Sequence, residues 1–180
     1  MALPKKLKMM DLFNEGNSYL GQTGEVTIPK LVRKFEDWRG GGMNGNVKID
    51  LGLGDDATEF NWKLGGIDAL VIEQFGAATV GAHMLRFTGS YQRDDTGETT
   101  AVEIVVRGRH EEIDFGNQKA GDDTETSIKT IWSYYKLSID GVEKILIDIP
   151  NMIERVNGVD LGGRRIIKKK KKFTYHSVLQ

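Results

Sequence analysis

The sequence contains no cysteine, and its 180 residues include only three prolines and three histidines. The lack of cysteine excludes disulfide bonds, thiolate metal sites and cysteine nucleophiles. No segment approaches the roughly 20 consecutive apolar residues that a membrane-spanning helix needs. The opening MALPKKLKMMDLFNEG is interrupted by charges throughout, so no signal peptide is expected. With 39% hydrophobic residues, the chain is expected to be soluble and to build a core of its own.

Basic charge is scarce outside the C-terminal segment. Residues 164–180 hold seven of the 25 basic residues and no acidic one, which leaves 18 basic against 26 acidic residues in 1–163, a net charge of −8. A body with this balance lacks the clustered cations that phosphate binding requires. We expect one domain over residues 1–163 and a disordered, solvated basic tail over 164–180. Binding of an acidic partner by the lysine run 168–172 is the alternative.

Most of the chain alternates between apolar and polar residues, as half-buried strands do. Residues 47–53 and 59–64 both alternate, and Gly54-Asp55-Asp56 between them has turn chemistry, so the two segments are predicted to pair as a hairpin. Further strands are predicted around 85–91 and 102–106, and over 126–139. Asp140-Gly141 is a strong hairpin signal, with a return strand through Ile145 and Ile147.

Two segments need separate arguments. Ile67, Leu70, Val71 and Phe75 share one helical face, so Ile67–Phe75 is predicted as the one helix, with Gly76 after it as a helix-ending residue. PKLVRKFEDW fits either a helix or a strand, and the extended preference of its start favours a strand. About eight strands and one short helix predict a mainly β domain, a sandwich or a barrel-like fold.

Motifs that suggest a cofactor or a metal have simpler explanations. GLGDDA, residues 52–57, formally matches the glycine fingerprint of dinucleotide-binding folds, but a strand pattern follows it where that site needs a helix. Aspartate pairs at 55–56, 94–95 and 122–123 all lie between predicted strands, where aspartate caps turns through its own backbone. We expect no cofactor and no metal site.

Nothing in the sequence assembles into a catalytic constellation. The three histidines have no ligand spacing, and no GxSxG nucleophile elbow is present. In RGRHEEID, alternation places Arg107, Arg109 and Glu111 on one face, which we interpret as a solvated or inter-subunit face. A small β-barrel enzyme using His110 and Glu111 is the alternative. We predict that the protein is not an enzyme.

The stretch EDWRGGGMNGN, residues 36–46, is unusual for a compact domain. It places Trp38 and Arg39 beside three consecutive glycines, and a glycine loses more backbone freedom on folding than any other residue. Such a run becomes useful where backbone passes close to another chain. Burial at a subunit contact, anchored by Trp38 and Met43, would then offset the entropy lost.

Several blocks of the sequence together resemble the major tail tube proteins of contractile-tailed bacteriophages, which also form the tube of R-type tailocins. The resemblance covers about residues 12–160. It rests on the order and spacing of the blocks LFNEGNSYLG, IPKLVRKFEDWRGGGMNG, VKIDLGL, GSYQRDDTGETTAVEIVVRGRHEEID, KAGDDTE, YYKLSIDG and IDIPNMIERVNGVD. The ending GGRRIIKKKKKFTYHSVLQ departs from the short, mixed-charge end expected of the family.

The resemblance implies a β-sandwich protomer with one helix and an extended inter-subunit hairpin, residues 47–64. Hexameric rings would stack into a hollow tube, assembled in the host cytoplasm and carried in the virion. The implied partners are further copies of the chain, the sheath, tape-measure and baseplate or terminator proteins, and DNA in transit. The residues expected at inter-subunit or ring-stacking contacts are Trp38, Arg39, Gly40, Gly41, Gly42, Met43, Asn44, Gly45, Asp55 and Asp56.

An acidic lumen would give DNA no deep binding wells, so it could slide. Glu103, Glu111, Asp148 and Glu154 are the residues expected to face such a lumen. Two alternatives remain. One is the tube of a DNA-less tailocin or a secretion-type injection system. The other is a nucleic-acid-binding β-domain that acts through its basic tail, with Phe173 and Tyr175 stacking on bases.

Overall fold

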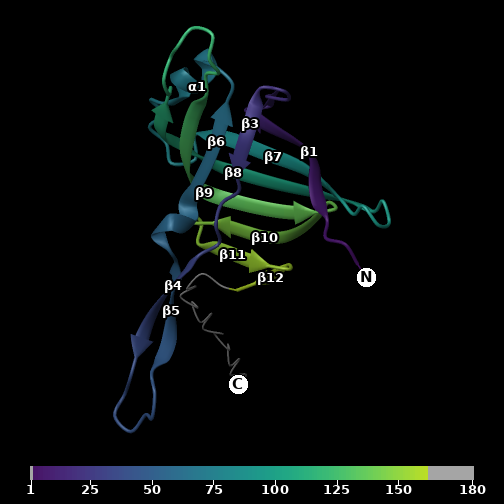
Figure 1. Cartoon of the computed structure of the whole chain (residues 1–180). Helices are drawn as coiled ribbons and strands as arrows, with labels where there is room; N and C mark the ends of the chain where they lie inside the picture. The colour runs from purple at the N-terminus through teal and green to yellow at the C-terminus, as the bar shows by residue number, and fades with distance from the viewer. Residues whose placement is uncertain (1, 162–180) are drawn as a thin grey trace, which may run out of the picture.

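The computed structural model describes residues 2–161, and the predicted basic tail lies outside them. Over this range the chain forms twelve strands, one α-helix and one 3₁₀ helix, so the prediction of a mainly β fold with one short helix is confirmed (Figure 1). The strands are β1 Lys6–Asn14, β2 Asn17–Ser18, β3 Thr23–Thr27, β4 Arg33–Trp38, β5 Val47–Leu53, β6 Glu59–Leu64, β7 His83–Gln92, β8 Thr99–Asp114, β9 Thr126–Ile139, β10 Val142–Asp148, β11 Ile153–Val156 and β12 Val159–Asp160. The helices are η1 Asp55–Thr58 and α1 Ala69–Gln74.

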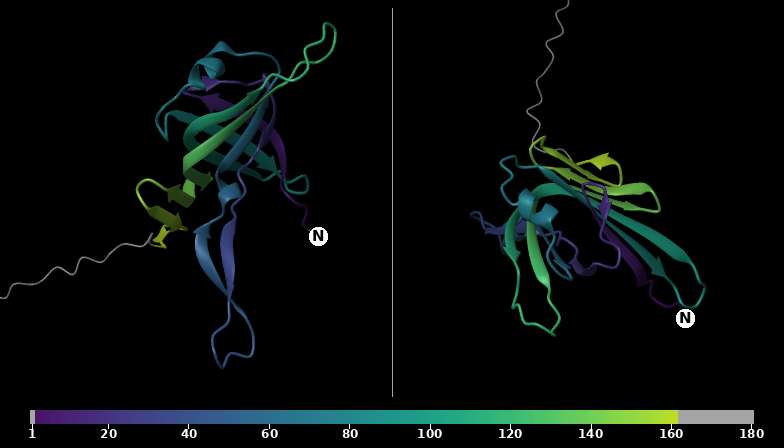
Figure 2. Two further views of the ribbon diagram at one scale, coloured as in Figure 1. Left: turned by 90° about the vertical axis from the view of Figure 1, so that its left-hand side faces the viewer. Right: turned by 90° about the horizontal axis from the view of Figure 1, so that it is seen from above.

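Ten of the strands form one antiparallel sheet that divides at β9. Its continuous order is β12-β11-β10-β9-β8-β7-β1-β2. One edge of β9 pairs with β8 over nearly its whole length, whereas the other edge pairs first with β6, from Thr126 to Ile131, and then with β10, from Tyr134 to Ile139. β3 pairs with the free edge of β6. The two halves of β9 therefore belong to two diverging parts of the sheet, and Figure 2 shows the resulting bend.

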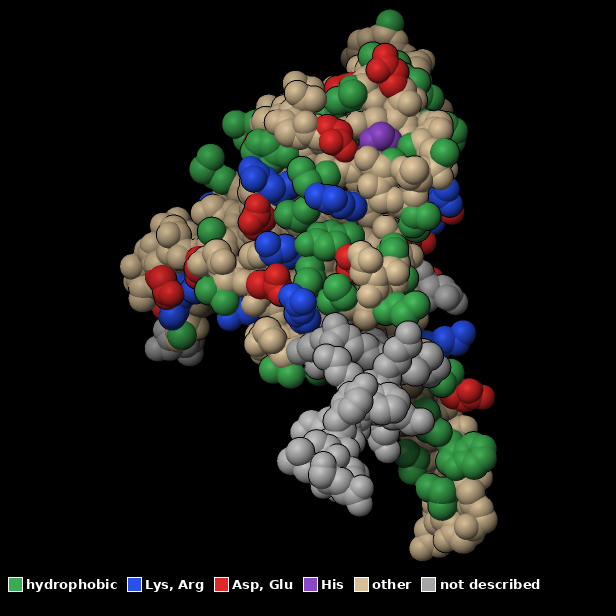
Figure 3. Space-filling model, turned by 180° about the vertical axis from the view of Figure 1, so that it is seen from behind, with side chains coloured by type: hydrophobic (Ala, Val, Ile, Leu, Met, Phe, Trp, Pro, Cys, Tyr) green, Lys and Arg blue, Asp and Glu red, His purple; other side chains and the backbone are tan. Residues whose placement is uncertain are grey.

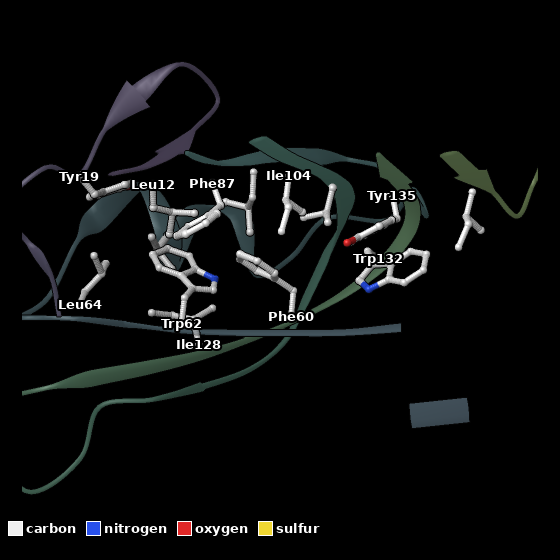
Figure 4. Close-up of a cluster of buried hydrophobic side chains, with 14 residues drawn as sticks. Leu12, Tyr19, Phe60, Trp62, Leu64, Phe87, Ile104, Ile128, Trp132 and Tyr135 are labelled. Carbon is white, nitrogen blue, oxygen red and sulfur yellow. The ribbon is translucent and has the colours of Figure 1, made fainter. Parts of the chain in front are cut away.

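The core lies inside this bend. Figure 4 shows Leu12 and Phe87, from β1 and β7, facing Trp62 and Ile128, from β6 and β9. β6 is buried at every second residue, Phe60, Trp62 and Leu64, as its sequence alternation predicts. Because successive residues of a strand point to opposite sides, each strand contributes one apolar face to the core and leaves the other outside.

β8 and β9 approach each other unusually closely at Gly108. A Cβ atom at this residue would lie 2.0 Å from the carbonyl oxygen of Ile131. The pairing register also shifts between Arg107 and Gly108, opposite the place where β9 changes its second partner from β6 to β10. Gly108 therefore permits the close crossing at which the sheet divides.

The hairpins predicted from the sequence are mostly confirmed, with one exception. β7 and β8 pair across the Asp94-Asp95 turn, and β9 and β10 pair across Asp140-Gly141, where both residues have positive φ, 50° and 77°. The predicted pairing of residues 47–53 with 59–64 is wrong. β5 pairs with β4, while β6 pairs with β3 and β9. Alternation shows which face of a strand is apolar but not which strand lies beside it.

Helix α1 is shorter than predicted, because its sequence places a cap inside the predicted range. The carboxylate of Asp68 accepts a hydrogen bond from the Leu70 amide at 2.7 Å and so starts the helix there. Val71 and Gln74 are buried, whereas Ile67 and Phe75, predicted on the buried face, are exposed. No helix of residues 2–161 is long and apolar enough to cross a membrane.

A buried hydrogen-bond network fastens α1 to the sheet. The side-chain amides of Gln74 and Asn14 bond to each other twice, at 2.7 and 3.1 Å, and Gln74 Oε1 also lies 3.2 Å from His110 Nε2. Since Gln74 Oε1 can only accept, His110 Nε2 carries the proton. His110 Nδ1 then accepts from the Thr130 hydroxyl at 2.9 Å, and Thr130 Oγ1 accepts from Trp62 Nε1 at 3.2 Å. With Nδ1 accepting, His110 is neutral in this arrangement.

The crossing predicts that Gly108→Ala destabilises the protomer strongly. The added methyl group would meet rigid backbone, so we expect a loss of about 3 kcal/mol in the free energy of unfolding. Gly76→Ala is the control, because its Cβ would enter open space at a residue without positive φ. Urea unfolding of both variants measures the difference, and equal midpoints would show that the crossing is not constrained.

The network predicts a stability loss in mild acid that depends on His110. Burial, and secondarily the charge of His83, lowers the pKa of His110 from 6.5 to about 4. Between these two values the unfolded chain binds a proton that the folded chain does not. Stability is therefore fully present above pH 6.5 and falls by about 3 kcal/mol as the pH drops to 4. His110→Gln removes this term. Urea unfolding at pH 7 and pH 4 should show a larger loss for the original chain, and equal losses would contradict the assignment.

Candidate functional site

β4 and β5 form a two-stranded sheet of their own, which we call the arm, residues 33–53. The arm projects away from the body in Figure 1 and in the left-hand view of Figure 2. PKLVRKFEDW is thus a strand at its C-terminal end, as predicted. The projecting hairpin runs from Arg33 to Leu53, so the predicted projecting range 47–64 is wrong for residues 54–64, which turn back into the body as η1 and β6.

The arm has one apolar face that nothing in the described chain covers. Trp38 pairs with Val47, and Glu36 pairs with Ile49, so these side chains point to one side. Leu51 follows on the same side by alternation. The other side holds Asp37, Lys48 and Asp50 together with Phe35, which is 53% exposed. Trp38 is 58% exposed and Val47 is 50% exposed. Figure 3 shows hydrophobic side chains gathered along the arm.

The tip of the arm, residues 39–46, is a compact loop held by Met43. The Met43 amide donates to the Gly40 carbonyl at 3.2 Å, and Met43 Sδ lies 3.1 Å from the Gly40 amide. Arg39 Nε donates to the Met43 carbonyl at 3.4 Å. Of the three consecutive glycines, only Gly42 has a positive φ, 86°. The tip therefore keeps Trp38, Arg39 and Met43 together at the far end of the arm.

Ionic and backbone contacts fix the base of the arm. The Arg33 guanidinium contacts the carboxylates of Asp50, within the arm, and Glu154, on β11 of the body. Two hydrogen bonds lower the pKa of the Asp50 carboxyl group. The larger effect comes from the Gly52 amide and the smaller from the Arg33 guanidinium. The Gly54 amide donates to the Val32 carbonyl at 2.8 Å where the arm meets the body. Arg33 thus links the two separate sheets at the base of the arm.

The ten residues predicted at inter-subunit contacts lie at two places on the protomer. Trp38, Arg39, Gly40, Gly41, Gly42, Met43, Asn44 and Gly45 all belong to the distal end of the arm. Asp55 and Asp56 begin η1 at its base, where Asp56 is exposed. Because η1 has four residues and leads into β6, GLGDDA opens no α-helix that could bind a dinucleotide.

The four residues predicted to face a lumen do not share one surface of the protomer. Glu103 and Asp148 lie on the same outer face of the sheet, since Glu103 is opposite Ser138 and Asp148 is opposite Tyr134. Glu111 points outward elsewhere and lies 3.0 Å from Lys129. Glu154 contacts Arg33 at the base of the arm. Lining of a lumen stays a prediction for all four.

The histidines have structural surroundings. His110 is buried in the network described above, whereas Glu111, its neighbour in sequence, is exposed and paired with Lys129. His83 and His110 stack with ring centroids 5.8 Å apart, and His83 lies 3.7 Å from Glu15. Residues 2–161 contain no cluster of three His, Asp or Glu side chains that could hold a metal ion.

Sequence reasoning missed part of this site. The alternation of Val47, Ile49 and Leu51 was interpreted as a strand against the protomer's own core, but all three are exposed on the arm. Arg33 and Glu154 lie 121 residues apart, and no local pattern links them. Two signals pointed to this region: the neighbouring glycine-rich loop, and the family resemblance, which implied an extended hairpin that includes residues 47–53.

Comparisons with known proteins agree with the resemblance found in the sequence. The family model described as phage tail tube protein FII matches residues 4–164. The tail tube protein of Escherichia phage P2 is 55% identical over 161 residues, 89% of this chain and 94% of that protein. The major tail tube protein of Serratia phage KSP20 is 38% identical over 167 residues, 93% of this chain and 96% of that protein.

Among solved structures, a chain of the anti-feeding prophage baseplate aligns with a TM-score of 0.52 at 9% identity. The alignment covers 74% of this chain and 91% of that one. At this identity the likeness concerns the fold alone. Both sequence relatives are named as tail tube proteins and not as enzymes, so the enzyme alternative is excluded. The match over nearly the whole described chain, with 55% identity to one member, shows that the protein belongs to the phage tail tube protein FII family.

Proposed function

We propose that this chain is the repeating subunit of the inner tube of a contractile phage tail. Copies form hexameric rings, and the rings stack into a hollow conduit for DNA. As a member of a phage tail tube family, the protein is a component of the virion. The observation that carries the proposal is the arm, because a hairpin with an uncovered apolar face completes its packing only against another chain.

The arm supports assembly through its energetics. An isolated two-stranded hairpin is marginally stable in water, and four apolar side chains, Trp38, Val47, Ile49 and Leu51, stand exposed on one of its faces. Burial of such a face contributes about 25 cal/mol per Å² of apolar surface. A neighbouring subunit would supply that burial, and Arg33 holds the arm ready for it.

The open edges of the sheet support ring formation. β1 pairs with β7 on one side, while on its other side β2 covers only Phe13 and Asn14. At the opposite end of the described sheet, β12 pairs only with β11. An unpaired edge offers a row of amide and carbonyl groups to another strand. Contacts between unlike edges of successive copies close into a ring when the rotation between copies permits.

The charge of the body supports a conduit. Residues 1–163 carry a net charge of −8, so an inner wall built from them offers phosphates no continuous array of cations. Glu103 and Asp148 share one outer face of the sheet, and Arg86 on that face lies 3.6 Å from Glu103. The same register places Arg107 and Lys136 on that face as well, so the acidic charge of the body is not concentrated there.

Removing apolar surface from the arm tests the proposal. Trp38→Ser with Ile49→Ser should abolish tubes in negative-stain images of the purified chain. Because both side chains are exposed, the free energy of unfolding should change by less than about 0.5 kcal/mol. The matched control, Asp37→Ser with Lys48→Ser, alters a cross-strand pair on the opposite face and leaves the net charge unchanged. Tubes of normal yield from the Trp38 and Ile49 variant would refute an assembly role for the arm.

A further inference from the structure

A groove crosses the outer face of the sheet over β1, β7 and β8. Its volume is about 520 Å³. Met9 on β1 and Leu20, in the loop after β2, form apolar walls and are 68% and 62% exposed. Ser90 and Ala101, which pair across β7 and β8, lie in its lining together with Gly89. Methionine adapts its shape to a partner, so these walls suit an apolar side chain inserted from outside.

The groove also carries negative charge. Asp11 and Glu103 are among its lining residues, and Arg86, which does not line the groove, lies 3.6 Å from Glu103 and offsets part of its charge. Asp11 Oδ2 accepts a hydrogen bond from the Ser18 hydroxyl at 2.7 Å. Asp11 Oδ1 is closed off from solvent and has no hydrogen-bond partner within residues 2–161. A buried acceptor without a donor is costly. Because Oδ1 is closed off from solvent, a positive group in the groove would act on this carboxylate through its charge and not through a bond to Oδ1.

We propose that this groove receives the arm of a second copy, with Trp38 inserted between Met9 and Leu20. The inference rests on the proposed function and names the surface on which the arm docks. Arg39 is the only charged residue of the arm tip, and it would approach Asp11 and Glu103. The arm points away from its own body (Figures 1 and 2). Its own copy therefore leaves the groove open for another.

Cysteine cross-linking tests this contact without background, because the chain has no cysteine. Val47→Cys places a thiol beside Trp38 on the apolar face, and Ser90→Cys places one in the groove. The two variants are mixed under assembly conditions and oxidised. A disulfide forms only when the two Cα atoms come within about 7 Å, so a docked arm should give a covalent dimer.

Two matched variants define the specificity of the cross-link. Lys48→Cys lies one residue from Val47 on the opposite face of the arm, and Thr79→Cys is exposed in the loop before β7, outside the groove. We expect about tenfold more dimer from the 47–90 pair than from the 48–90 or 47–79 pair. Tubes that form while the 47–90 pair stays unlinked would overturn the groove assignment and leave the proposed function standing. Failure of the unmodified chain to form tubes would overturn both.

Filling the groove provides an independent test. Ala101→Trp adds a large side chain at an exposed residue of β8 that lines the groove. We expect an unchanged unfolding midpoint and loss of tubes, while the control Ala101→Thr assembles. Normal tube formation by a folded Ala101→Trp variant would show that the groove stays empty in the assembly.

Discussion

Burial of one apolar face per strand is the constraint on which this structure depends. In the body the bend at β9 satisfies it, because β6 and the first half of β9 turn toward β1 and β7 and enclose Trp62 and Phe87. In the arm the same alternation has no partner. Body and arm follow one rule, yet only the body fulfils it within a single copy. This difference leaves the arm with an apolar face that the described chain does not cover.

Two rigid features join these parts. Gly108 lets β8 and β9 cross closely enough for the sheet to divide, and Arg33 ties the arm to β11, which belongs to the part of the sheet beyond the division. The base of the arm is thus connected to the body. A preorganised arm loses less entropy on docking than a flexible one, and contacts between rigid surfaces give a repeating assembly a constant geometry.

Sequence predicted the local structure better than the pairing. Strand β9 begins and ends where its β-branched and aromatic run predicted, and Asp140-Gly141 forms its hairpin, since turn chemistry acts between neighbours in sequence. The predicted pairing of β5 with β6 is wrong, because two alternating strands joined by a short turn have the same sequence pattern whether or not they pair with each other. The polar network was not predicted either. Asn14, Gln74 and Thr130 occupy inward positions. Only the fold shows that their polar groups form hydrogen bonds with one another or with His110. For the site, the glycine stretch indicated the right region, whereas the exposure of the whole arm appears only once the body is complete.

A contact between the arm of one copy and a different surface of the next has a consequence for mixtures of intact and altered subunits. A contact with two unlike halves, one donor and one acceptor, gives each copy a polarity. A subunit that keeps its acceptor but loses its donor can still be joined by an intact neighbour, and then offers nothing to the next. Small amounts of such a subunit would terminate growing polymers. Substitutions that disable this hairpin would therefore inhibit the assembly of intact subunits, a dominant-negative effect, and would not only remove the altered subunit from the tube.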